Sequence, residues 1–266
     1  MLDCLPFFHL DNNELLAIFQ DLQPDINLSA TQLNNLLTGL SNNDLYKNLQ
    51  NENFSIEDFN QNFSSAQEFD LRCLHINIHS LNAKLDEFVL LIESLDISFD
   101  IICLTEVWST NIQFHACALQ KYNFYYDLPK SGIVGGVGIF INKSIQCKIR
   151  NDLYIKSNSS NRIENLWFEI SKSGSKFLIG CIYRHPSSSV ADFIKLLETT
   201  LCKINTRKLP CVLLADMNID LLKLCSSTPL RGYINCLVSN NFLPILLLAT
   251  RVTRSSATLI DHIFTF

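Results

Sequence analysis

The stretch Pro210–Asp220, PCVLLADMNID, most constrains how this chain can fold. Its apolar run Cys211–Ala215 predicts a short strand that is buried on both faces, and the run ends at Asp216 and Asn218. Side chains two residues apart on a strand lie on the same side, and ligands of α/β proteins collect at the carboxyl ends of strands. From this stretch alone a plain turn is an equal alternative, because Asp and Asn are also common turn residues.

The length of 266 residues, with 47% hydrophobic and 18% charged residues, allows a large core. The N-terminus has no basic segment that would indicate a signal peptide, and no apolar run approaches the ~18 residues of a membrane span. The ten cysteines form no Cys-x-x-Cys pair, a pattern typical of reduced thiols in a core. We therefore expect an intracellular protein without a membrane partner.

Charge divides the chain into two parts. Residues 1–70 carry eleven acids and one base, a net charge of −10, whereas residues 71–266 carry 20 bases and 15 acids, a net charge of +5. A mildly basic domain suits a polyanionic partner, although an ordinary surface beside an acidic tail is equally consistent. We interpret residues 1–69 as an acidic, helical or partly disordered extension, with helices near Asn13–Leu22 and Ser29–Leu40.

Residues 70–266 alternate between strand and helix patterns. Helices are predicted at Ser80–Leu95, Val190–Ile204 and Pro229–Asn240. Strands are predicted at Leu71–Asn77, Asp100–Glu106, Tyr122–Tyr126, Gly135–Ile141, Ile145–Arg150, Ile163–Ile170, Lys176–Arg184, Pro210–Asn218 and Leu259–Phe266. Because hairpins are mixed with crossovers, we predict an α/β fold in which two mixed β-sheets pack face to face with helices outside.

Three further strands end in polar residues, as the first one does. Asn77, Glu106 and Tyr183 close apolar runs that should hold them rigidly, and they join Asp216 and Asn218. Two carboxylates, two carboxamides and a phenol at one edge suit Mg²⁺-assisted attack on a phosphate, since Mg²⁺ takes few carboxylates and keeps waters. We expect these side chains and Asp261 to converge on one cleft.

Six segments, in order, carry a family resemblance: HINIHSL, IICLTEVW, GGVGIFI, GCIYRHPSS, LLADMNIDL and ATRVTRSSATLIDHIFT. They resemble the endonuclease/exonuclease/phosphatase superfamily, and within it the apurinic-endonuclease-like domains of non-LTR (LINE-type) retrotransposons. The last segment is similar to the retroelement branch rather than to sphingomyelinases or inositol phosphatases. The resemblance implies a DNase I-like α-β-β-α sandwich.

The resemblance also implies roles for single residues. Glu106 would bind the metal beside Asn77, which would also lie close to Asp216, and the cofactor would be Mg²⁺ or Mn²⁺. Tyr183 would contact the scissile phosphate. Asp216 would position or deprotonate the attacking water, and Asn218 would orient that water.

Four more residues complete the implied site. Thr250 would lie near a DNA phosphate, Arg184 and His79 would bind substrate, and Asp261 would orient a catalytic histidine. The implied substrate is double-stranded DNA. A full-length element would carry a reverse transcriptase domain on the same chain, and its endonuclease would work in the nucleus.

Two departures from the family pattern stand out. The usual Gly-Asp-Phe-Asn is Ala215-Asp216-Met217-Asn218 here, a change that should leave the site intact. The family's terminal Ser-Asp-His motif does not appear before Phe266, and His262 follows the orienting Asp without being the catalytic histidine. We therefore expect weak nuclease activity. A catalytically inactive remnant or nucleic-acid-binding module is an alternative, and a phosphatase or phospholipase of the superfamily is another.

Overall fold

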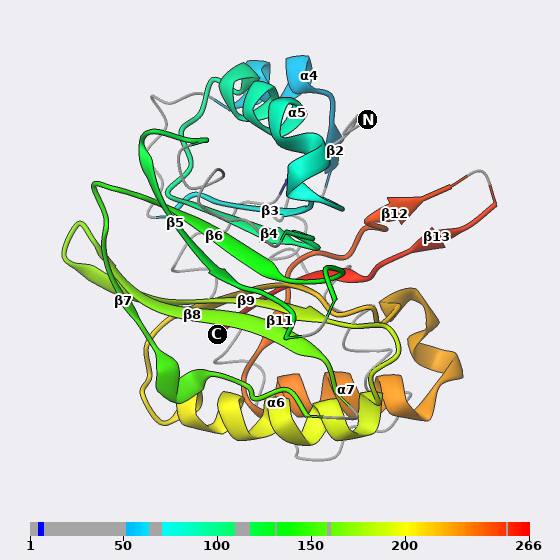
Figure 1. Cartoon of the computed structure of the whole chain (residues 1–266). Coiled ribbons are helices and arrows are strands. Elements are labelled where there is room, and N and C mark those ends of the chain that lie inside the picture. The colour runs from blue at the N-terminus through cyan, green and yellow to red at the C-terminus, as the bar shows by residue number, and fades with distance from the viewer. Residues whose placement is uncertain are drawn as a thin grey trace.

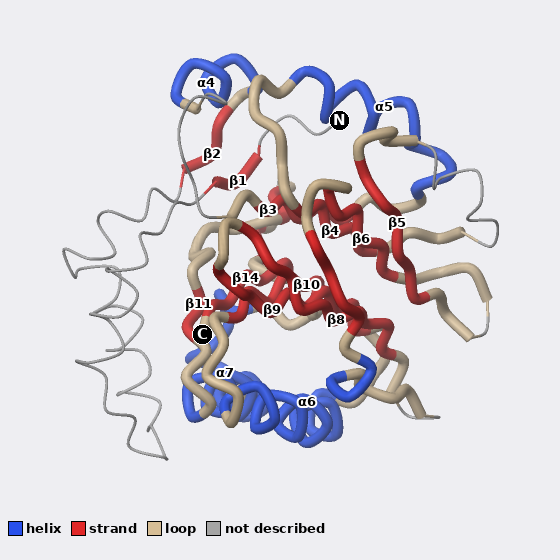
Figure 2. Tube along the Cα trace, turned by 90° about the vertical axis from the view of Figure 1, so that its left-hand side faces the viewer, coloured by secondary structure: helices blue, strands red, loops and turns tan. Residues whose placement is uncertain are grey.

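The computed structural model describes residues 5–7, 52–63, 71–109, 118–130, 132–158, 161–253 and 255–266. The helices predicted at Asn13–Leu22 and Ser29–Leu40 lie outside this part of the chain. The described residues form two large β-sheets and two short two-stranded pairs. Helices cover the outer face of each large sheet (Figures 1 and 2).

The first sheet contains four strands in the order β3-β4-β6-β5. Their bounds are Cys73–Asn77 for β3, Ile101–Thr105 for β4, Tyr122–Asp127 for β5 and Val137–Asn142 for β6. Strands β3 and β4 are parallel, whereas β6 is antiparallel to both β4 and β5. Helix α5, Leu81–Ser94, packs on the outer face, and the Ser80 hydroxyl caps it by accepting the Ala83 N–H.

The second sheet contains six strands in the order β11-β14-β10-β9-β8-β7. The bounds are Gln146–Ile149 for β7, Ile163–Lys172 for β8, Ser175–Arg184 for β9, Cys211–Asp216 for β10, Leu243–Pro244 for β11 and Asp261–Thr265 for β14. Strand β10 is parallel to β9 and antiparallel to β14. Helices α6, Val190–Asn205, and α7, Thr228–Ser239, cover its outer face, and the 3₁₀ helices η2, Asn151–Leu153, and η3, Leu221–Ser226, flank them (Figure 1).

Alternation along the strands builds three apolar layers. On β4, Ile102 and Leu104 pack towards α5, whereas Ile101 and Cys103 belong to the core between the two sheets. A third core lies between the second sheet and α6–α7 and includes Leu213. The predicted sandwich of two mixed sheets with helices outside is therefore confirmed.

A short antiparallel pair precedes the sandwich: β1, Leu5–Phe7, and β2, Glu52–Phe54. Helix α4, Ile56–Asn62, follows, and Phe54, Phe59 and Phe63 are buried in the same core as Phe88 of α5. The sequence patterns predicted only helices and polar linkers before residue 70, because a three-residue strand leaves little periodicity.

A hairpin of β12, Arg251–Val252, and β13, Ala257–Thr258, projects from the sandwich beside the start of β14 (Figure 1). Val252 is 70% exposed. None of the helices in the described part of the chain has the length and apolar character needed to cross a membrane.

Candidate active site

Asn77 joins the two sheets at their strand ends. Its Nδ2 donates to Glu106 Oε1 at 2.9 Å and to Asp216 Oδ2 at 2.8 Å. Parallel pairing places Asn77 and Glu106 at one end of the first sheet, and β10 delivers Asp216 from the second. The structure thus brings together three of the residues predicted from strand ends, with both carboxylates on one amide nitrogen.

Asp216 is fully buried and lies between two other predicted residues. Tyr183 of β9 and Asp261 of β14 are its direct partners on the neighbouring strands, and the Asn218 N–H donates to Asp216 Oδ1 at 3.1 Å. The pKa of Asp216 is raised to about 8, mainly by burial and secondly by repulsion from Asp261 and Glu106. Without a nearby cation this carboxyl group therefore holds its proton near neutral pH.

Asp261 is the third acid of the cluster. Its Oδ1 is buried and has no hydrogen-bond partner. Burial raises the pKa of Asp261 to about 6, and a hydrogen bond with the Thr250 side chain limits this rise. The Thr250 hydroxyl also accepts the N–H groups of Ile260 at 3.3 Å and Asp261 at 3.2 Å. Thr250, predicted to lie near a DNA phosphate, therefore fixes the start of β14.

Glu106 follows β4 in a left-handed conformation, with φ of 54°. His79 Nε2 lies 4.0 Å from Glu106 Oε2, and the His79 ring packs on Trp108 with the centroids 4.1 Å apart. The His79 side chain is 54% exposed. The predicted substrate-binding histidine thus lies at the rim of the cluster, where it can meet a substrate.

The orientation of Asn77 bears on its predicted metal role. Its Nδ2 faces both carboxylates, and its Oδ1 accepts the His79 N–H at 3.2 Å. Two acceptors on one side require the NH₂ group there, so the amide offers no free oxygen to a cation beside Glu106. In this arrangement Asn77 positions the two acids, which fits its predicted catalytic role but not that of a metal ligand.

The donor set fits Mg²⁺ better than a transition metal. Among the described residues, no three His, Cys, Asp or Glu side chains are grouped as a complete metal site. Mg²⁺ needs only one or two carboxylates, together with water and substrate phosphate oxygens. Glu106 supplies one such carboxylate, and the unpaired Asp261 Oδ1 is a buried acceptor that a hydrated cation would satisfy.

Arg184 does not lie where a substrate-binding residue should. Its side chain is only 2% exposed. Its guanidinium donates to the backbone carbonyls of Met217 at 2.6 Å, Ser188 at 2.6 Å and Asn218 at 2.9 Å. The prediction is corrected here: Arg184 holds the loop after β10, because three carbonyl acceptors occupy its donors inside the protein.

Asn218 is held by the same residue. Its Nδ2 donates to the Arg184 carbonyl at 2.9 Å, and its backbone is left-handed, with φ of 49°. Asn tolerates this conformation better than most residues. The side-chain donor predicted to orient water is thus engaged, and it is the backbone N–H of Asn218 that contacts Asp216.

His262 points away from the acids. It is 1% exposed, its Nδ1 lies 3.1 Å from the Tyr233 hydroxyl, and its Nε2 lies 3.1 Å from the Leu259 carbonyl. Burial lowers the pKa of His262 to about 4, so the ring is neutral. These contacts place it in the core beneath α7 and agree with the interpretation that it is not the catalytic histidine.

Glu164 of β8 was missed by the sequence reasoning. It is 5% exposed, lies directly opposite Tyr183 in the sheet and accepts the Gly136 N–H at 3.3 Å. Burial raises the pKa of Glu164 to about 7. A signal did exist: extending the predicted hairpin of β8 and β9 back from its short turn pairs Glu164 with Tyr183.

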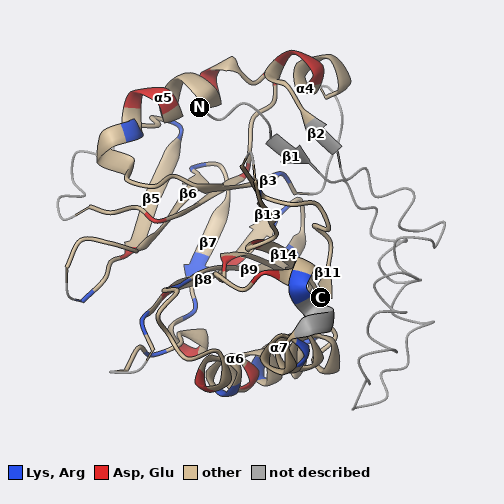
Figure 3. Cartoon of the chain, turned by 90° about the vertical axis from the view of Figure 1, so that its right-hand side faces the viewer, with Lys and Arg blue, Asp and Glu red and all other residues tan. Residues whose placement is uncertain are grey.

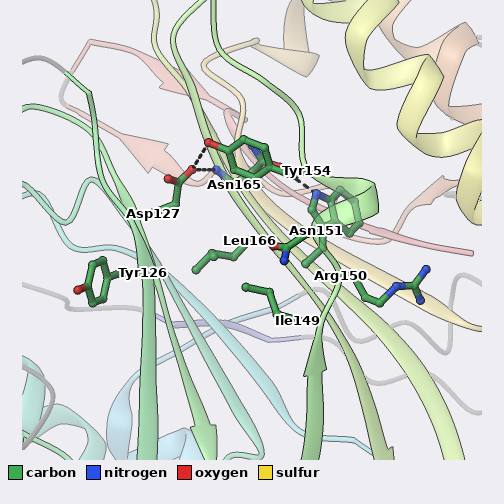
Figure 4. Close-up of a pocket in the computed structure, with 9 residues that line it drawn as sticks. Tyr126, Asp127, Ile149, Arg150, Asn151, Tyr154, Asn165 and Leu166 are labelled. Carbon is green, nitrogen blue, oxygen red and sulfur yellow. Dashed lines mark hydrogen bonds between the residues drawn. The ribbon is translucent and has the colours of Figure 1, made fainter.

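A separate cavity of about 210 Å³ lies beside β5, β7 and β8 (Figure 4). Tyr126, Tyr154 and Trp167 are among its lining residues. Asp127 Oδ2 accepts the Tyr154 hydroxyl at 3.1 Å and the Asn165 N–H at 2.9 Å, which satisfies that oxygen internally. None of the predicted site residues lines this cavity, so it is distinct from the acidic cluster.

The family model for "Endonuclease/Exonuclease/phosphatase family" matches residues 74–265, which is more than half of the chain. The chain belongs to this family. The matched range includes every predicted site residue from Asn77 to Asp261. None of the curated proteins compared with the chain is significantly similar to it.

Solved structures share the fold at low sequence identity. The endonuclease domain of TRAS1, a telomere-specific non-LTR retrotransposon, superposes with a TM-score of 0.52 at 10% identity, covering 73% of this chain and 84% of that one. An AP endonuclease from Archaeoglobus fulgidus gives 0.53 at 15%, covering 73% and 86%. The Bacteroides thetaiotaomicron mannosyl-6-phosphatase Bt3783 gives 0.52 at 14%, covering 73% and 85%. The family fold thus includes both nucleases and phosphatases.

Proposed function

We propose that this chain is a Mg²⁺-dependent phosphodiesterase domain that nicks double-stranded DNA, as the endonuclease of a non-LTR retrotransposon does. The observation that carries the proposal is the shared amide of Asn77, which holds Glu106 and Asp216 from two different sheets. Within the described part of the chain, no Lys or Arg forms an ion pair with Glu106, Asp216 or Asp261. Buried acids that lack such partners are typical of sites that bind a cation and a phosphate.

Glu106 would hold the cation, with Mn²⁺ as a substitute for Mg²⁺. When bound, the metal would neutralise charge on the phosphate oxygens during attack. A cation would stabilise the ionised acids of this cluster, because burial and repulsion from neighbouring carboxylates raise the pKa of Asp216 and of Asp261.

Asp216 is suited to take the proton of the attacking water. The water oxygen would form a bond to phosphorus, and its proton would pass to an Asp216 oxygen. The bond from phosphorus to one deoxyribose oxygen would break, and that oxygen would take a proton from solvent water and leave as a hydroxyl. The Asp261 carboxylate makes Asp216 a stronger base by repelling its negative charge. Tyr183 keeps its proton at neutral pH, because burial raises its pKa, and its hydroxyl can therefore donate to a phosphate oxygen.

Charge favours an approach of DNA from the strand-end side. Helices α4 and α5 present acidic segments on the outer face of the first sheet (Figure 3). The β12–β13 hairpin instead exposes Arg251 and Val252 beside Thr250 and the acidic cluster. A projecting basic and apolar hairpin suits a duplex better than a small phosphate ester.

The retroelement origin rests on the last sequence segment, which contains this hairpin and Asp261. A reverse transcriptase domain on the same chain and work in the nucleus belong to the same proposal. The fold is also shared with the TRAS1 endonuclease domain, although at an identity that speaks for architecture alone.

A nicking assay tests the proposal. We expect the chain to convert supercoiled plasmid slowly to open circles in Mg²⁺ and to lose this activity in EDTA. Parallel assays use bis(p-nitrophenyl) phosphate as a diester and p-nitrophenyl phosphate as a monoester. Cleavage confined to the monoester would replace the nuclease with a phosphatase, and plasmid binding without any cleavage would indicate a non-catalytic binding module.

A further inference from the structure

The backbone after β4 adopts conformations that L residues rarely take. Glu106 has φ of 54° and Trp108 has φ of 44°. Such residues persist where the surrounding structure determines their conformation. On one side, the Ser80 N–H donates to the Glu106 carbonyl at 2.9 Å. The metal-binding carboxylate therefore depends on neighbours that keep this segment in place.

The Gly135–Gly136 turn holds the other side of the same segment. The Val107 N–H donates to the Gly136 carbonyl at 3.3 Å, and the Trp108 N–H donates to the Gly135 carbonyl at 3.0 Å. Both glycines have positive φ, of 113° and 89°, which suits their lack of a side chain. The position of this turn thus sets the position of residues 106–108.

Glu164 lies behind the turn and is in contact with it. Its Oε2 accepts the Gly136 N–H at 3.3 Å, and a Cβ atom on Gly135 would lie 2.9 Å from that oxygen. The same Cβ would lie 3.1 Å from Cε1 of Tyr183, the direct partner of Glu164 in the sheet. The turn, the carboxylate and the phenol ring are therefore packed together without room for a methyl group.

A second hydrogen bond ties the start of β8 to the segment that contains this turn. The Arg162 guanidinium donates to the Val134 carbonyl at 3.0 Å. Arg162 and Glu164 thus both bind the same short segment. Arg162 donates to one of its carbonyls, and Glu164 accepts one of its N–H groups. The cost of burying Glu164 is explained if the carboxylate has a task at this place.

We propose that Glu164 is a positioning residue, which fixes the Gly135–Gly136 turn so that the turn holds Glu106 in place while Tyr183 packs against it. The inference rests on the proposed function for the roles of Glu106 and Tyr183. It adds that one acid of β8, Glu164, fixes the position of Glu106 in the first sheet relative to Tyr183 in the second.

Hydrogen exchange and metal binding test this without requiring nuclease turnover. In Glu164→Ala, the Val107 and Trp108 amides should exchange about tenfold faster, because the turn loses its anchor. Mn²⁺ titration should show about tenfold weaker binding, as for other residues that orient a metal ligand. Glu164→Gln keeps an acceptor for Gly136 and should restore both readouts to within about twofold of wild type.

Glu169→Ala is the matched control, since Glu169 lies on the same strand and pairs with Arg150 and Lys176 instead. It should leave both readouts unchanged. If Glu164→Ala fails to fold, Glu164→Asp withdraws the carboxylate by one methylene and should show the same losses. A folded Glu164→Ala or Glu164→Asp chain with wild-type exchange at Val107 and Trp108 would overturn the proposal. Absence of Mn²⁺ binding by the wild type would instead count against the proposed function, and exchange would still decide the role of Glu164.

Discussion

Two groups of acids in this molecule have opposite surroundings. Asp152 lies near the end of α6, and its carboxylate is 2.9 Å from Arg150 and 2.7 Å from Arg207. Arg150 also pairs with Glu169 at 3.0 Å, so these two acids form the paired group. The hydrogen bond from Arg150 lowers the pKa of Asp152 to about 2. Asp216 and Asp261 are buried partners on neighbouring strands, where burial first and repulsion from other carboxylates of the cluster second raise their pKa values to about 8 and about 6.

Acids that serve the fold are paired with cations in this molecule, whereas the acids of the cluster are not. The chain uses Arg150 and Arg207 to neutralise the first group. At the second it provides an amide, one backbone N–H group and a hydroxyl, while the field of Arg251 from β12 favours the ionised forms without an ion pair. A fold that can pair its carboxylates but leaves these unpaired keeps them available for a cation.

The largest expected effect is catalytic. Asp216→Ala should lower plasmid nicking in Mg²⁺ by about 10³-fold or more, because it removes the proposed base from a group of residues that act together. Asp152→Ala removes an acid of the paired group and should leave the nicking rate unchanged. Equal losses in both variants, or robust nicking by Asp216→Ala, would erase the functional distinction between the two groups.

Metal affinity should distinguish the groups next. Glu106→Ala should weaken Mg²⁺ binding by at least about tenfold in titration calorimetry, because it removes the carboxylate proposed to hold the metal. Glu169→Ala, in the paired group, should bind Mg²⁺ as the wild type does. Indistinguishable titrations of wild type and Glu106→Ala would remove Glu106 from the metal role.

Stability should change in opposite directions when each group loses a charge. Asp261→Asn should stabilise the metal-free chain at pH 8 by about 1 kcal/mol, since it removes a buried charge and its repulsion of Asp216. For a domain of this size, the midpoint temperature of thermal unfolding should then rise by about 2–4 °C. Asp152→Asn should instead lower it, because Arg150 and Arg207 lose their carboxylate. A destabilised Asp261→Asn chain would contradict the repulsion.

The smallest expected effect is the pH dependence of stability in EDTA. A folded-state pKa above the unfolded value of 3.8 means that the folded chain binds more protons, so Asp216 destabilises the chain progressively until about pH 8. Between about pH 7 and pH 8 the urea midpoint should therefore fall, and saturating Mg²⁺ should reduce the slope. The buried neutral His75 and His262 act in the other direction, but only below their ordinary pKa of 6.5. A urea midpoint that rises between about pH 7 and pH 8 would contradict the raised pKa of Asp216.

The sequence predicted the sandwich and the meeting of strand ends because both follow from local patterns. Apolar runs that end at Asn77, Glu106 and Asp216 fix which residues reach the edge once the strands pair. The role of Arg184 could not be predicted, since its carbonyl acceptors belong to a loop whose path depends on the whole fold. The same holds for the amide orientation of Asn77, which is decided by acids from two sheets.

The aromatic residues ahead of the sandwich limit where the sandwich can be separated from the residues before it. The ring centroids of Phe54 and Phe63 lie 5.6 Å apart, and with Phe59 these residues belong to the core that contains residues of α5. A chain that began at residue 71 would leave this core without its three phenylalanines and expose an apolar surface that favours association. A fusion that transfers this domain to another protein must therefore include residues 52–63.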